Sequence, residues 1–142
     1  MMWKRNLSVD ALNALCAQSA VSHLGIEFSE KGADYLEARL LVCEKSSQPM
    51  GFLHGGASVL LAETVGSLAG LCCVEQGMAV VGSEINASHL RPVKLGDTVR
   101  ARATALRLGK TQHVWQIAII DSADRLVCQS RLTLQVVKAQ PK

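Results

Sequence analysis

The sequence predicts an α+β domain in which one long helix is wrapped by a curved antiparallel sheet of about six strands. Three observations lead to this fold class. Residues 54–77 have helical periodicity and are apolar on nearly every side, which is typical of a buried helix. Two strand-like segments precede this helix and four follow it. A sheet must curl around such a helix to cover the sides that would otherwise face water.

The elements before the long helix are short. Residues 8–19 are predicted to form a helix that Ser8 can cap. Residues 24–28 and 34–42 are predicted to be strands, joined by a turn at Lys31-Gly32. A loop with proline and glycine then leads into the long helix.

The four later strands alternate apolar and polar residues, most clearly in the last of them. They are predicted at residues 79–90, 98–108, 113–121 and 126–137. Gly77 is expected to end the helix that precedes them. Because one curved sheet covers a single helix unevenly, we expect a second subunit to complete the burial.

Length and composition indicate one cytoplasmic domain spanning residues 1–142. The net charge of +3 is too mild to suggest nucleic-acid binding, and no apolar run suggests a membrane span. The first residues do not resemble a secretory signal. The five cysteines are odd in number and contain no C-x-x-C, which favours reduced thiols and neither disulfides nor a metal site.

Glu63 has the clearest chemical implication. It stands among apolar residues of the long helix, where an isolated carboxylate is costly unless it is paired or functional. We interpret it as a catalytic base or nucleophile. The alternative is that it lies on an exposed seam or satisfies an internal hydrogen bond. Ser67, one turn later on the same face, can hydrogen-bond the carboxylate or simply fill space.

The start of the long helix, His54-Gly55-Gly56, is a candidate oxyanion site. The first N–H groups of a helix lack internal partners and carry partial positive charge. Glycine lets a substrate carbonyl approach this backbone closely, and Gln48 could add a side-chain N–H. The alternative is a glycine-rich helix start that binds no ligand.

The spacing of Gly55 and Glu63 constrains any site that uses both. Eight residues correspond to about 12 Å along a helix. A nucleophile and an oxyanion donor must both lie about 3 Å from the same carbonyl. Two antiparallel copies of the helix can meet this requirement, so we expect a site that spans a dimer interface.

Two basic segments are candidate phosphate contacts. His89 and Arg91 precede Pro92 at a strand end, and Arg107 and Lys110 lie in a later turn. The alternative for all of them is solvated surface charge. Four other cations are interpreted as ordinary terminal charges: Lys4, Arg5, Lys138 and Lys142.

The segment QPMGFLHGGASVLLAETVGSLAG (48–70) resembles the signature of hotdog-fold thioesterases of the phenylacetic-acid-degradation and 4-hydroxybenzoyl-CoA group. The resemblance includes residues 20–28, 80–93, 106–117 and 130–134, and so covers nearly the whole chain. It implies the hotdog fold, dimers paired into a tetramer, and hydrolysis of an acyl-CoA thioester. CoA is then part of the substrate, and no cofactor is expected.

The resemblance also implies roles for individual residues. Glu63 becomes the nucleophile or general base, and the Gly55 N–H, helped by Gln48 and His54, lies at the thioester carbonyl. Ser67 matches a residue near the reacting carboxylate. The following residues match segments that line the CoA path: Gly82, His89, Leu90, Arg91, Pro92, Leu106, Arg107, Leu108, Gly109, Lys110 and Thr111. The family often has Arg at Lys110 and a basic residue at Leu90, which weakens the expected phosphate contacts there.

The favoured acyl group, on this resemblance, is a hydroxylated aromatic one such as 1,4-dihydroxy-2-naphthoyl, an intermediate of menaquinone biosynthesis. Proofreading of aryl thioesters on a carrier protein is the alternative substrate. Two other functions stay open from the residues: a hotdog module that binds acyl-CoA without cleaving it, and a dehydratase that uses His54 with Glu63.

Overall fold

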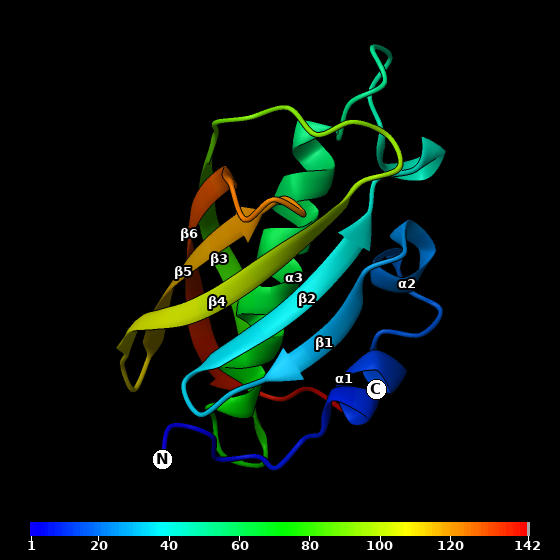
Figure 1. The fold of residues 1–142 in the computed structure, drawn as a ribbon. Helices are drawn as coiled ribbons and strands as arrows, with labels where there is room; N and C mark the ends of the chain where they lie inside the picture. The colour runs from blue at the N-terminus through cyan, green and yellow to red at the C-terminus, as the bar shows by residue number, and fades with distance from the viewer. Residues whose placement is uncertain (142) are drawn as a thin grey trace.

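The computed structural model of the protein describes residues 1–141 and confirms a long helix with six antiparallel strands (Figure 1). The helical elements are α1 (Val9–Leu15), α2 (Ala20–Leu24), the short 3-10 turn η1 (Glu44–Ser46) and α3 (Gly55–Cys72). The strands are β1 (Glu27–Lys31), β2 (Tyr35–Leu41), β3 (Met78–His89), β4 (Thr98–Leu108), β5 (Gln112–Ile120) and β6 (Leu126–Lys138).

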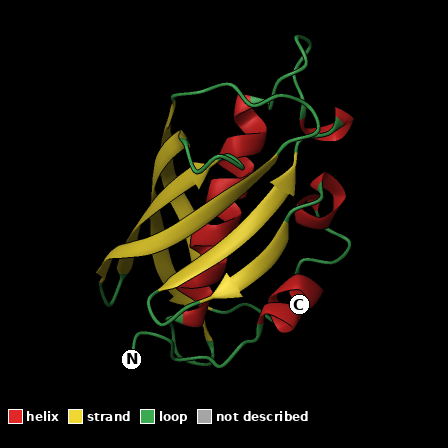
Figure 2. Ribbon diagram, in the orientation of Figure 1, coloured by secondary structure: helices red, strands yellow, loops and turns green. Residues whose placement is uncertain are grey.

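The strands form one sheet that curves around α3, as Figure 2 shows. Their order is β1-β2-β4-β5-β6-β3, and every neighbouring pair is antiparallel. The short helix α2, which leads into β1, also contacts α3. The outer strands β1 and β3 leave one strip of α3 only partly covered. We call this strip, formed by Leu60, Glu63, Ser67 and Leu68, the α3 seam.

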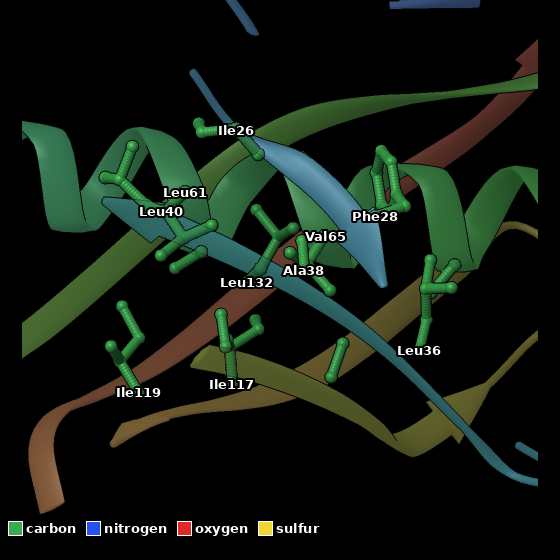
Figure 3. Packing of buried hydrophobic residues seen from close by; sticks show 14 of the residues in the cluster. Ile26, Phe28, Leu36, Ala38, Leu40, Leu61, Val65, Ile117, Ile119 and Leu132 are labelled. Atoms are coloured by element: carbon green, nitrogen blue, oxygen red, sulfur yellow. The ribbon is translucent and has the colours of Figure 1, made fainter. Parts of the chain in front are cut away.

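The rest of α3 is apolar because it lies inside the sheet. Leu61 and Val65 are fully buried and face Leu40, Ile117 and Leu132 across the core (Figure 3). Burying a side chain of this size stabilises a fold by about 1.5–3 kcal/mol. The helix is long and apolar enough to cross a membrane, with a mean hydropathy of 1.3, but 56% of it is buried in the protein. Its composition is therefore that of a core helix.

Two elements before β2 differ from the expectation. The predicted helix 8–19 ends early, and the predicted strand 24–28 begins inside a second helix, α2. Gln18 has a φ of 59°, which interrupts the first helix. Ser19 then starts α2 with a capping box, and Gly25, at a φ of 90°, ends it. These polar and glycine residues are equally common in loops, so the sequence pattern alone did not reveal α2.

The N-terminal segment holds the far end of α3. The N–H groups of Lys4 and Arg5 donate to Cys72 O at 2.8 and 3.0 Å. The Arg5 guanidinium donates to three carbonyls beyond the helix, those of Val74, Glu75 and Met78. These bonds satisfy groups left free where α3 ends, well before the predicted end. The interpretation of Arg5 as an ordinary terminal charge is therefore wrong. Lys138 is exposed, as expected for such a charge, and Lys142 lies outside the described residues.

The inner face of β5 and β6 carries three buried polar atoms without a hydrogen-bond partner in residues 1–141. They are His113 Nδ1, Trp115 Nε1 and Ser130 Oγ. The His113 ring meets Trp115 edge-on, with ring centroids 6.4 Å apart. Burial, and secondarily the charge of Lys4, lowers the pKa of His113. The imidazole is therefore neutral in the folded protein at neutral pH.

His113 should make the fold sensitive to acid. The unfolded imidazole binds a proton near pH 6.5, whereas the folded one does so only at lower pH. The stability linked to His113 is therefore present above the unfolded pKa and lost as the pH falls through the lowered folded pKa. His113→Phe keeps a ring but removes this titration, so its Tm should fall less than that of the wild type between about pH 7 and pH 5.

Calorimetry over this pH range checks the prediction. His23→Phe, at an exposed position of α2, is the control and should keep the wild-type acid sensitivity. Parallel Tm curves for His113→Phe and the wild type would contradict the assignment.

Candidate active site

The loop before α3 is fixed by its own hydrogen bonds. Gly51 N donates to Gln48 O at 2.9 Å, closing a turn in which Gly51 has a φ of 84°. His54 N donates to Ser46 O at 2.8 Å. The Gln48 side-chain oxygen accepts from Met50 N. Because this oxygen faces the turn, the Gln48 NH₂ group is free to donate elsewhere.

His54 caps α3 and leaves the Gly55 N–H available. The His54 Nδ1 atom accepts from Gly56 N at 2.8 Å, so the ring proton lies on Nε2. The His54 carbonyl accepts from Ala57 N and Ser58 N at 3.0 and 3.1 Å. Within residues 1–141, the Gly55 N–H has no such acceptor. It is a free donor at the positive end of the helix dipole.

A cleft of about 550 Å³ opens beside this free donor. It brings together six residues predicted for the site: Gln48, Gly55, His89, Leu90, Arg91 and Pro92. Leu90 N and Arg91 N both donate to Val127 O, at 2.8 and 3.3 Å, which fixes the segment after β3. Ser58 also lines the cleft, although sequence reasoning missed it. Its signal was a hydroxyl three residues after Gly55 in the first turn of a mainly apolar helix.

His89 lies directly over Gly55. A Cβ at Gly55 would be 3.1 Å from His89 Nε2 and 3.3 Å from His89 Cε1. These distances are tighter than ordinary van der Waals contact, so a side chain at residue 55 would require the imidazole to shift by a few tenths of an ångström. The close approach places a polar ring beside Gly55, at the start of α3.

Glu63 lies in the middle of the α3 seam and is partly buried. With Ser67 it lines a shallow hollow of about 300 Å³. The other lining residues are Ala20 and Val21 of α2, and Leu60, Thr64 and Leu68 of α3. The Glu63 carboxylate has no hydrogen bond or ion pair with another residue in the described part of the chain. The alternative of an internal hydrogen bond is therefore wrong, whereas the other alternative, a partly exposed seam, describes the position of Glu63 in one protomer.

Gly82 of β3 leaves space for this carboxylate. A Cβ at Gly82 would collide with Glu63 Oε1. The register of β3 against β6 shifts between Gly82 and Glu84, so Ser83 is the extra residue of a β-bulge. The Ser83 hydroxyl donates to Thr133 O at 3.2 Å. The resemblance implied a CoA contact for Gly82, and the structure adds this steric role.

The remaining predicted residues lie elsewhere in the protomer. Residues 106–111 form the end of β4 and the turn into β5, where Gly109 N donates to Gln112 O at 2.8 Å. Leu108, Gly109 and Lys110 line a second cleft of about 620 Å³ beyond the C-terminal end of α3. Gly55 lies at the opposite end of this helix, about 25 Å away. One protomer therefore does not bring the two basic segments together.

Each protomer carries a carboxylate without a partner in residues 1–141 and a free N–H donor at the start of the same helix, about 12 Å away along its axis. Such a combination suits acyl transfer, because the donors stabilise an oxyanion and the carboxylate supplies a nucleophile or base. The fold and these two groups are those expected of hotdog enzymes that act on thioesters.

Comparison with known proteins assigns the family. The family model described as "Thioesterase superfamily" matches residues 50–128 of the chain. A thioesterase from Haemophilus influenzae has a crystal structure with a TM-score of 0.95 and 54% identity, covering 97% of this chain and 96% of that one. Two curated relatives are each 47% identical over 96% of this chain. The first is 1,4-dihydroxy-2-naphthoyl-CoA hydrolase of Escherichia coli, and the similarity spans 100% of that protein. The second is the proofreading thioesterase EntH of Cronobacter turicensis, and the similarity spans 99% of that protein.

The chain belongs to the thioesterase superfamily and has its hotdog fold. It is a thioester hydrolase. The resemblance noted in the sequence is thereby confirmed, and the readings as a dehydratase or as a non-catalytic binding module are set aside.

Gly82→Ala should slow the chemical step, because the added methyl group must displace the Glu63 carboxylate. A displacement of about 1 Å can cost about 100-fold in rate. We expect a lower kcat with little change in KM, measured by steady-state thioester hydrolysis. In the Glu63→Asp background the carboxylate is shorter, so Gly82→Ala should add little further loss. If the double variant lost kcat by the product of the two single losses, the steric role of Gly82 beside Glu63 would be contradicted.

Proposed function

We propose that the protein hydrolyses an aromatic acyl-CoA thioester, with 1,4-dihydroxy-2-naphthoyl-CoA as the favoured substrate. The E. coli relative named for this reaction supports the choice of acyl group. The observation that carries the proposal is the unpartnered Glu63 carboxylate in an otherwise mainly apolar hollow. Apolar walls suit an aromatic ring, and in this proposal the carboxylate acts on the thioester that the ring carries.

We propose further that each active site is shared by two protomers. Gly55 and Glu63 are about 12 Å apart along one helix, too far to reach one carbonyl. Within residues 1–141, strand β3 lies at the end of the sheet and pairs with β6 alone, so its other edge is free beside the α3 seam. Antiparallel pairing of two such edges would set Gly55 of one protomer against Glu63 of its partner. We expect these dimers to pair into tetramers, which analytical ultracentrifugation would measure.

In this mechanism the Gly55 N–H and the Gln48 NH₂ donate to the thioester oxygen. Each such donor is worth about 2.7–4 kcal/mol of barrier when charge develops on that oxygen. Glu63 either attacks the carbonyl carbon, forming an anhydride that water opens, or takes a proton from the attacking water. In both cases the C–S bond breaks, CoA leaves as a thiol and the acid is released. His54 Nε2–H is a further donor at this end, and Ser67 can hydrogen-bond Glu63.

The CoA portion would follow the cleft from Gly55 past His89 and Arg91. The Arg91 guanidinium can bind a phosphate with two parallel hydrogen bonds. With the two α3 helices antiparallel, the turn that carries Lys110 in one protomer approaches the cleft of its partner. Lys110 then adds a positive charge without the fork geometry of arginine.

The alternative is a proofreading thioesterase that acts on aryl groups held by an acyl-carrier protein. The similarity to EntH supports it as strongly as the similarity to the naphthoyl-CoA hydrolase supports the first proposal. Values of kcat/KM on matched aryl-CoA and aryl-carrier-protein thioesters test the two. Preference for 1,4-dihydroxy-2-naphthoyl-CoA supports the proposal, a preference for carrier-protein thioesters favours the alternative, and hydrolysis of neither contradicts both.

A cytoplasmic location is also part of the proposal. The five thiols are unpaired, and four of them are buried. Burial raises the pKa of Cys73 to about 12, which disfavours the reactive thiolate. Fractionation of the source cells would test the location directly.

A further inference from the structure

The short helix α2 forms one side of the hollow that contains Glu63. Ala20 and Val21 are its two residues in that lining, whereas Leu60, Glu63 and Leu68 come from α3. Gly82 of β3 also approaches the carboxylate, since a Cβ there would collide with Glu63 Oε1, but it contributes no side chain to the lining. Ala20 and Val21 of α2 are therefore the side chains that line the hollow beside Glu63 without belonging to α3.

Val21 is held firmly in this wall. Its carbonyl accepts from Ile26 N at 3.0 Å, and its side chain is half-buried against the core. Ser19 and Gly25 fix the two ends of the helix by a capping box and a left-handed turn. A side chain anchored in this way cannot easily move away from a large ligand. The volume of the Val21 side chain should therefore limit the size of a ligand that binds in the hollow.

The chemistry of the hollow restricts its occupant. Apart from Glu63, the lining carries no charge, and its polar groups are the Thr64 and Ser67 hydroxyls. Its volume of about 300 Å³ is at the lower end of the range for small-molecule sites. A neutral, mainly apolar group with one or two hydroxyls fits this lining better than a charged one.

We infer that Val21 of α2 is a specificity-determining residue that sets the size of the acyl group that can reach Glu63. The inference rests on the proposed function, because it takes the occupant to be the acyl part of a thioester substrate. A larger residue at this position narrows the hollow and selects against bulky acyl groups, whereas a smaller one widens it.

The test compares the full-length wild type with Val21→Phe and Val21→Ala on naphthoyl-CoA and propionyl-CoA. One misfitting methylene-sized group changes kcat/KM by about 10-fold or more. We expect Val21→Phe to lower the ratio of kcat/KM for naphthoyl-CoA over propionyl-CoA by at least about tenfold. Val21→Ala should raise the same ratio. If Val21→Phe does not fold, the ratio measured for Val21→Ala tests the inference by itself. His23→Phe adds the same ring at an exposed position of α2 outside the hollow and should leave the ratio unchanged.

The outcomes separate this inference from the proposed function. If the wild type hydrolyses the thioesters but both Val21 variants change the two substrates by one common factor, the inference is overturned and the thioesterase proposal stands. An equal shift of the ratio in His23→Phe would also overturn it. If the wild type hydrolyses no aromatic acyl thioester, the proposed function itself fails.

Discussion

Glu63→Gln is expected to lower kcat for thioester hydrolysis by about 100- to 10 000-fold, the range for loss of a positioned acid–base group. Glutamine has nearly the shape of glutamate but neither accepts a proton nor attacks a carbonyl. The structural cost should be small, because Glu63 has no hydrogen bond or ion pair with another residue in 1–141. Circular dichroism and Tm should match the wild type, and calorimetric titration should show CoA binding unchanged.

Glu75→Gln is the matched control for this variant. It makes the same substitution in an exposed carboxylate near the end of α3, whose ion pair with Lys4 is 3.2 Å long and open to solvent. Its turnover should stay near that of the wild type. If the Glu63→Gln enzyme retained turnover within a few-fold of the wild type, the proposal that Glu63 acts as nucleophile or base would be contradicted.

Two inactive variants should restore each other when they share a dimer. Gly55→Val places a side chain where a Cβ alone would be 3.1 Å from His89 Nε2, so it blocks the oxyanion end of the site. A dimer that pairs this variant with Glu63→Gln has one site with both residues intact and one with both altered. Random pairing makes half of the dimers mixed, so co-expression should recover about a quarter of wild-type activity.

The measurement compares the co-expressed mixture with each variant expressed alone. The separately purified variants, mixed without subunit exchange, are the control and should stay inactive. No recovery in co-expressed dimers that mass spectrometry shows to be mixed would place Gly55 and Glu63 in one protomer's site and contradict the shared arrangement.

The fold was largely predictable because its strongest signals are periodic. The all-round apolar character of α3 and the alternation along β6 each follow from burial by neighbouring layers, and both are visible in the sequence. Element ends were less predictable. The break at Gln18 and the early end of α3 depend on contacts with residues distant in sequence, such as Arg5 with Met78.

The site was predictable where its chemistry is local. Gly55 as a free donor follows from its place at a helix start, and Glu63 stood out as a carboxylate among apolar residues. The contact between Gly82 and Glu63 and the wall formed by Val21 were not predictable, because each joins elements that meet only in three dimensions. The separation of Lys110 from Gly55 within one protomer likewise follows from topology rather than from a motif.

The bonds from Lys4 and Arg5 to the end of α3 bear on how the protein can be handled. Met1 is fully exposed, so an affinity tag placed before it should not disturb these bonds. Cleavage after Arg5, in contrast, would leave the last turn of the reactive helix to fray into solvent. The trimmed protein should therefore melt at a lower temperature in calorimetry than the protein with residues 1–5 intact, although the cut lies at the end of α3 opposite Gly55.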